Sequence, residues 1–91
     1  MQVVLNWTAV PNALSYNIYR SQTSGSGYQL IFTTLTANSY TDGPQNLTNG
    51  VAYYYVVTSV TADGESAFSN QYTATAPVFP TAPSGLTGVV S

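Results

Sequence analysis

The 91-residue chain has no cysteine, no histidine and no lysine, and only four of its side chains are charged. Without cysteine it forms no disulfide, and without cysteine and histidine it lacks the usual ligands of zinc. Its only basic side chain is Arg20, and one cation cannot form the basic surface that nucleic acids and anionic membranes require. No apolar run approaches the roughly 18 residues of a transmembrane helix, so we expect no membrane insertion.

The same shortage limits catalysis, because nucleophile–base pairs built on histidine, cysteine or lysine cannot form. Three carboxylates remain: Asp63 and Glu65 are close together in an expected turn, and Asp42 is distant in sequence. A glycosidase needs two carboxylates held about 5–9.5 Å apart across a cleft, and calcium needs about 6–8 oxygen ligands. We therefore interpret all three as solvated turn residues and predict no enzyme activity, no cofactor and no metal.

The residues that are present favour strands. Hydrophobic residues make up 44% of the chain and aromatic residues 13%, with eight tyrosines, which excludes the composition of a disordered chain. Threonine, valine and tyrosine are abundant, and all three favour β-structure. Polarity comes from uncharged side chains, a composition typical of extracellular surfaces and fibres, so we expect a secreted or cell-surface protein.

Alternation of apolar and polar residues predicts a succession of short strands. Ala62-Asp63-Gly64 predicts a tight hairpin, since Asp-Gly is a strong hairpin signal. Turn signals recur every 8–12 residues or so, which is typical of an all-β sandwich or barrel. The predicted strands cover residues 3–8, 16–19, 28–34, 39–41, 51–61 and 66–76.

Several motifs along residues 2–76 resemble the fibronectin type III family. They are Leu5-x-Trp7 and Tyr16-Asn-Ile18-Tyr19-Arg20 for strands B and C, Asn38-Ser39-Tyr40-Thr41-Asp42 ahead of the E–F region, Leu47-x-x-Gly50-x-x-Tyr53 for the E–F tyrosine corner, and Gly64-Glu65-Ser66-x-x-Ser69-Asn70 for the F–G hairpin. The resemblance implies an immunoglobulin-like, two-sheet Greek-key sandwich with sheets A-B-E and C′-C-F-G, and it implies no catalysis.

Five apolar side chains are expected in the core of this sandwich: Leu5, Trp7, Ile18, Tyr53 and Val57. Period-2 alternation places them on inward faces. The resemblance further implies that the hydroxyl of Tyr53 bonds the backbone of the E–F connection.

Strand A of the family is missing at the start of the chain, and a segment like it stands at the far end. The strand order in sequence is thus expected to be B-C-C′-E-F-G-A. We predict a sandwich over residues 1–76 that lacks its first strand, a proline-rich linker over residues 77–83, and the strand A equivalent over residues 84–91.

A short, stiff linker favours donation of that last strand to another copy. Our first hypothesis is therefore a non-catalytic structural module that assembles head to tail into a filament, its partner being itself. The donor residues are Leu86, Val89 and Val90, and the acceptor strand carries Val3, Leu5 and Trp7. Donation within one chain stays open. The alternative hypothesis is a spacer or binding module from a tandem secreted protein, accessory to a carbohydrate-active enzyme.

A second surface is predicted on the outward face of the C-F-G sheet. If Tyr53 and Tyr55 face inward, the residues Tyr19, Tyr54, Val56 and Val60 form an apolar outer patch. Such a patch fits lateral packing of filaments, binding of a polysaccharide, or cross-strand pairs that only stabilise the sheet.

Overall fold

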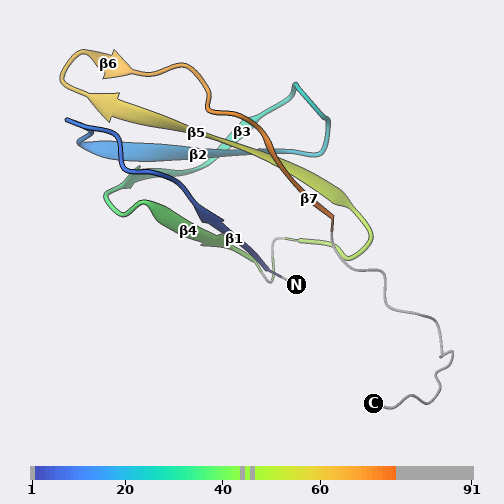
Figure 1. The fold of residues 1–91 in the computed structure, drawn as a ribbon. Coiled ribbons are helices and arrows are strands. Elements are labelled where there is room, and N and C mark those ends of the chain that lie inside the picture. The colour runs from blue at the N-terminus through green and yellow to red at the C-terminus, as the bar shows by residue number, and fades with distance from the viewer. Residues whose placement is uncertain (1, 44, 46, 76–91) are drawn as a thin grey trace, which may run out of the picture.

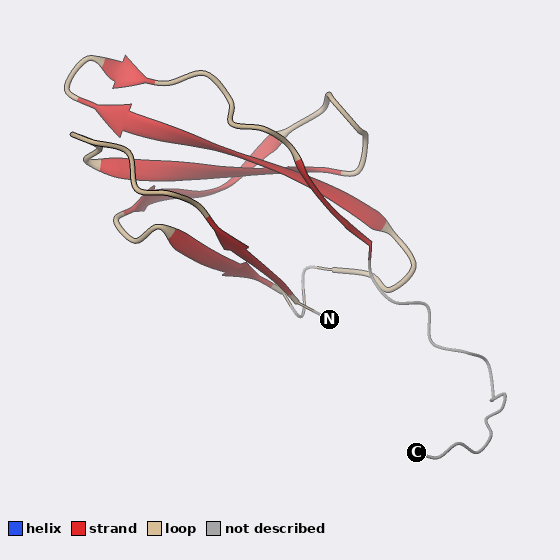
Figure 2. Ribbon diagram, in the orientation of Figure 1, coloured by secondary structure: helices blue, strands red, loops and turns tan. Residues whose placement is uncertain are grey.

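The computed structural model describes residues 2–43, 45 and 47–75, and these form β-strands without any helix (Figure 1, Figure 2). Within this part of the chain there is accordingly no helix that could cross a membrane. The strands are β1 (Val3–Asn6), β2 (Ser15–Ser21), β3 (Gln29–Leu35), β4 (Ser39–Asp42), β5 (Ala52–Thr61), β6 (Gly64–Glu65) and β7 (Tyr72–Thr75).

The strands form two antiparallel sheets that face each other (Figure 1). The smaller sheet pairs β1 with β4, with Val3 opposite Asp42 and Asn6 opposite Ser39. The larger sheet has the order β3-β2-β5-β6, and β7 pairs with β5 as well. These are strands B and E against C′, C, F and G, so the predicted two-sheet, all-β sandwich is confirmed.

The strand that returns after β5 is not continuous, and the prediction of one strand over residues 66–76 is wrong. The predicted hairpin is present, with Thr61 opposite Gly64 across a two-residue turn. Regular pairing stops after Glu65 and resumes only in β7, where Tyr72 lies opposite Tyr55. The residues between form an irregular connection along the edge of β5.

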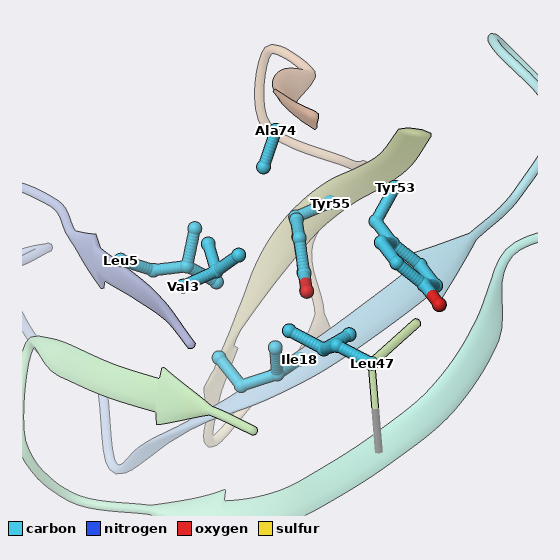
Figure 3. Close-up of a cluster of buried hydrophobic side chains, with 7 residues drawn as sticks. All are labelled: Val3, Leu5, Ile18, Leu47, Tyr53, Tyr55 and Ala74. Carbon is cyan, nitrogen blue, oxygen red and sulfur yellow. The ribbon is translucent and has the colours of Figure 1, made fainter. Parts of the chain in front are cut away.

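The core lies between the two sheets, and Figure 3 shows the side chains that meet there. Ile18 is fully buried, and Leu5 and Tyr53 expose 6% and 2% of their surface. The prediction that these three are core residues is confirmed. Within the described part of the chain, the buried apolar cluster consists of Val3, Leu5, Ile18, Leu47, Tyr53, Tyr55 and Ala74.

Trp7 and Val57 were predicted to be buried, but both are only half-buried. Trp7 packs on the edge of the core, with its ring centroid 5.3 Å from that of Tyr16 in an edge-to-face arrangement. Trp7 and Val57 both line a hollow beside β1, which explains why water reaches them.

The connection from β4 to β5 is tied down by Tyr53. Its hydroxyl accepts a hydrogen bond of 2.7 Å from the backbone N–H of Thr48, and Leu47 beside it is buried. The predicted role of Tyr53 in this crossover is confirmed. A buried ring with a satisfied hydroxyl holds a long connection against the sheet.

Asp42 corrects the interpretation of the carboxylates as solvated turn residues. It ends β4 and exposes 1% of its surface. Its Oδ2 accepts hydrogen bonds of 2.7 Å from Arg20 Nη1 and 2.7 Å from the Tyr55 hydroxyl. The Arg20 guanidinium also lies 5.9 Å from the centre of the Tyr53 ring. The carboxylate is therefore part of the core, paired as a buried charge must be.

Candidate functional site

Two of the predicted acceptor residues, Val3 and Leu5, lie on β1, which has one open edge, whereas Trp7 follows directly after the strand ends at Asn6. β1 pairs with β4, and no other strand among the described residues pairs with it. Val3 and Leu5 point into the core, whereas Val4 between them is 52% exposed. Because an unpaired strand edge presents backbone N–H and C=O groups, it can accept an added strand.

A groove runs between this open edge and the segment that follows β6, residues 66–75. One hollow of about 320 Å³ is lined by residues of β1, Trp7, β5 and Tyr72. A second hollow, between β1 and β7, shares Val4 and Tyr72 with the first. A third hollow continues beyond β1 and shares Trp7 and Val57 with the first. Figure 3 shows Val3 and Leu5 on one side of this gap and Tyr55 and Ala74 on the other. The groove thus follows the whole of β1: its two hollows near Trp7 are lined chiefly by apolar side chains, and the hollow beside β7 has a mixed lining.

Trp7 adds a polar feature to the groove. Its indole Nε1 is buried and has no hydrogen-bond partner among the described residues. Buried donors in native proteins nearly always have an acceptor. The donor residues Leu86, Val89 and Val90 lie outside the described residues, as do the linker over residues 77–83 and the whole segment 84–91.

The outer face of the larger sheet differs from the predicted apolar patch. Tyr19, Tyr54 and Val60 are half-buried, and Val56 is only 3% exposed, so its place in an exposed patch is wrong. Tyr19 lies opposite Val56 on the neighbouring strand. Neighbouring side chains therefore cover the valine, which stabilises the sheet and presents no surface to a partner.

Three aromatic rings gather on this face, and two of them were not predicted there. Phe68 is 52% exposed, and its ring centroid lies 5.2 Å from that of Tyr19 and 5.3 Å from that of Tyr28. Both contacts are edge-to-face. The sequence gives no sign of this cluster, since Phe68 belongs to the segment predicted as a regular strand.

Glu65 lies beside these rings and is held by three donors. Its Oε2 accepts hydrogen bonds of 2.5 Å from the Thr58 hydroxyl, 2.5 Å from the Tyr19 hydroxyl and 3.1 Å from the Asn17 amide. These bonds lower the pKa of Glu65 below its usual value, with Thr58 contributing most. The hydrogen bond between the Tyr19 hydroxyl and Glu65 in turn raises the pKa of Tyr19. Glu65 is therefore a fixed, exposed carboxylate and not a free turn residue.

The carboxylates of the described residues do not face one another. Asp42 and Tyr55 lie on the inner side of β5, whereas Glu65 bonds Thr58 on its outer side. Asp63 is exposed in the hairpin turn. A sheet separates the two hydrogen-bonded carboxylates, so they cannot flank one glycosidic bond in the way that hydrolysis requires.

Comparison with known proteins places this fold in a wider context. No protein-family model matches the chain. It is 48% identical over 80 residues to an amylopullulanase of Thermoanaerobacter thermohydrosulfuricus, an alignment that covers 87% of this chain and 5% of that protein. The chain therefore corresponds to a small part of this much longer relative.

Two solved structures are similar as well. An Fn3-like protein from Clostridium thermocellum superposes with a TM-score of 0.75 at 36% identity, over 88% of this chain and 81% of that one. A beta-1,2-glucanase from Parabacteroides distasonis superposes with a TM-score of 0.71 at 30% identity, over 87% of this chain and 11% of that one.

Proposed function

The chain belongs to the fibronectin type III family, and on this premise we propose that it is a non-catalytic module of a larger extracellular protein that acts on polysaccharides. The observation that carries the proposal is the small share of its relatives that it matches: 5% of an amylopullulanase and 11% of a glucanase. A segment of that size leaves the rest of each protein to supply the chemistry.

The placement of the carboxylates supports a non-catalytic role. Glycoside hydrolysis needs an acid and a second carboxylate on one cleft, and Asp42 and Glu65 act on opposite sides of β5. The module therefore serves the parent protein by spacing its parts or by binding.

The test is to assay the purified 91-residue chain for release of reducing ends from pullulan, soluble starch and β-1,2-glucan. We expect no release from any of the three. Hydrolysis that persists through a final size-exclusion step and is abolished by Glu65→Gln would overturn the proposal.

The groove beside β1 supports a second candidate function, head-to-tail assembly. In this proposal residues 1–76 form the sandwich, residues 77–83 a linker, and residues 84–91 an added strand in the groove of another copy. Leu86 fills the apolar gap beside Leu5 and Trp7. Burial of one leucine contributes about 1.5–3 kcal/mol, and each added backbone hydrogen bond about 0.5–1.5 kcal/mol.

The direction of the chain favours another copy over the same one. β7 ends beside the start of β1, since Thr75 and Val3 line one hollow (Figure 1). An antiparallel partner of β1 must begin beside Trp7, about 13–17 Å away at 3.3 Å per residue. Eight residues separate Thr75 from Ser84. At about 3.1 Å per extended residue, five or six are needed for that distance alone, which leaves too few for the two reversals.

Light scattering over a range of concentrations tests this assembly. We expect particles larger than 9.6 kDa that grow with concentration, and loss of growth when residues 84–91 are deleted or Leu86 is replaced by aspartate. Thr87→Asp is the matched control, because alternation places it on the opposite face. A monomer at every concentration for the intact chain refutes assembly in trans.

A further inference from the structure

We propose that the hollow between Tyr19, Glu65 and Phe68 on the outer face of the larger sheet binds a neutral glucan chain, an inference that rests on the proposed function. The hollow is lined by these three residues together with Thr58, Ser66 and Ala67. Its volume of about 430 Å³ lies within the roughly 300–1,000 Å³ of small-ligand sites.

Phe68 supplies an apolar platform. Half of its surface remains exposed even though Tyr19 and Tyr28 both contact it edge to face. Those two contacts restrict the rotation of the ring, so little conformational entropy is lost when a ligand stacks on it. The C–H face of a pyranose ring is flat and apolar and matches such a platform.

Glu65 supplies the polar contact beside the platform. Three donors from β2 and β5 converge on its Oε2 and hold the carboxylate in one position. Its second oxygen can accept hydrogen bonds from a ligand, and a bond to an ionised acceptor is about twice as strong as one between neutral groups. Sugar hydroxyls are donors of this kind and lie at the edge of the ring that stacks.

The Asn17 side chain extends the polar row across the sheet. Its amide donates to Glu65, and its carbonyl oxygen accepts a hydrogen bond of 2.6 Å from the Thr33 hydroxyl on β3. Hydroxyl and amide groups therefore follow one another across β3, β2 and β5 up to the carboxylate. A line of this kind suits a chain of sugar residues, each of which carries several hydroxyls.

Other ligands fit the same surface less well. A single carboxylate cannot supply the about 6–8 oxygens of a calcium site, and a nucleic acid would meet a negative charge without compensating cations. A proline-rich peptide could stack on the aromatic rings. It offers few N–H donors, however, and would leave Glu65 without a new partner as it loses water, which costs free energy.

Affinity electrophoresis of the full 91-residue chain tests the site. The chain carries a net charge of −2 and migrates in native gels, so binding to a polymer in the gel slows it. Pullulan, soluble starch and β-1,2-glucan serve as three probes, and they distinguish the linkages that the site accepts. Hydrolysis is measured on the same preparation.

We expect at least one glucan to retard the wild-type chain. Phe68→Ala should weaken the affinity about tenfold or more, as expected when a central aromatic contact is lost, and Glu65→Gln should weaken it several-fold. Phe32→Ala is the matched control. It removes an aromatic ring that is 43% exposed and contacts only Tyr40 among the described aromatic residues, and it should bind as the wild type does. Near-ultraviolet circular dichroism checks that each variant is folded.

The site is overturned by no retardation with any of the three glucans, by equal retardation of the wild type and Phe68→Ala, or by an equal loss of affinity in Phe32→Ala. Displacement of the bound glucan by a peptide of residues 77–83, with tighter binding of the peptide, assigns the surface to a protein ligand and also overturns it. A chain that binds no glucan and hydrolyses none refutes this site alone, whereas a chain that hydrolyses glucan refutes the proposed function.

Discussion

Replacing Asp42 by alanine tests the most unexpected feature of the core, the buried carboxylate between the sheets. Asp42 is 1% exposed and accepts hydrogen bonds from Arg20 and Tyr55. Asp42→Ala removes the acceptor for both. The Tyr55 residue is itself only 1% exposed, so its hydroxyl then has no route to water, whereas the Arg20 side chain is 24% exposed and can be hydrated.

The magnitude follows from these burials. A buried hydroxyl left without an acceptor costs about 1–3 kcal/mol. Breaking a fully buried ion pair costs about 3–5 kcal/mol, but partial hydration of Arg20 removes much of that penalty. We expect a total loss of about 2–4 kcal/mol. A domain of this size has a stability of about 5–14 kcal/mol, and each kcal/mol shifts its Tm by about 4–8 °C, so Tm should fall by roughly 10–30 °C.

Urea unfolding followed by tryptophan fluorescence measures the effect, with Asp63→Ala as the matched control in an exposed turn. Asp63→Ala should cost less than about 1 kcal/mol. In the double variant of Asp42→Ala and Tyr55→Phe, the orphaned hydroxyl is gone, so the loss should be smaller than the sum of the single losses by about 1 kcal/mol or more. A loss for Asp42→Ala no larger than that of the control, or strict additivity in the double variant, would refute this reasoning.

Three further predictions concern single side chains. Tyr53→Phe removes the acceptor of the Thr48 N–H and should cost about 1–2 kcal/mol in urea unfolding; an unchanged midpoint contradicts a structural role for that bond. Thr34 has a φ of 61° where β3 carries an extra residue opposite β2. A branched side chain is strained in this conformation, so Thr34→Gly should raise Tm or leave it unchanged. A fall in Tm contradicts the strain. Burial, and then the hydrogen bond to Asp42, raise the pKa of Tyr55 above its usual value of 10.0. Because the unfolded chain loses this proton first, the stability that Tyr55 contributes is complete below pH 10 and falls above it. Tyr55→Phe should therefore reduce the slope of the unfolding free energy against pH by up to about 1.4 kcal/mol per pH unit. An equal slope in the variant and the wild type contradicts the raised pKa.

The sandwich could be predicted because its signals are local. Alternation along β1, β2 and β5 places Leu5, Ile18 and Tyr53 on inward faces, and the pleat of a strand makes this pattern dependable. The Asp-Gly pair at residues 63–64 fixes the hairpin, since Gly64 takes a φ of 121° that other residues avoid. Each of these features depends on a few consecutive residues.

The features that the sequence did not reveal depend on partners far along the chain. Asp42 is buried only because Arg20 and Tyr55, on two other strands, reach it. Val56 alternates correctly toward the outer face and is nonetheless covered. Alternation predicts which face a side chain occupies, but not whether neighbouring side chains cover that face.

The position of Phe68 follows from a change of register that two serines make possible. Ser66 lies beside Ser59, and Tyr72 pairs with Tyr55, so the return segment advances six residues while β5 advances four. The two extra residues interrupt the ladder, and hydroxyls replace the missing carbonyls. Val57 N donates to Ser69 Oγ and Ser59 N to Ser66 Oγ, while both serine N–H groups still donate to β5.

This substitution of side chain for backbone determines which residue faces outward. Between Ser66 and Tyr72, the residues Ala67 and Ser69 line the hollow near Trp7, and the ring of Phe68 lies against Tyr19 on the outer face. A regular strand in continuous register would have satisfied the same N–H groups with carbonyls and needed no serine at either position. The serines of Ser66-x-x-Ser69 therefore satisfy the N–H groups that the irregular edge would otherwise leave without acceptors. That edge carries the aromatic platform on one side and one wall of the β1 groove on the other, so the same few residues shape both surfaces.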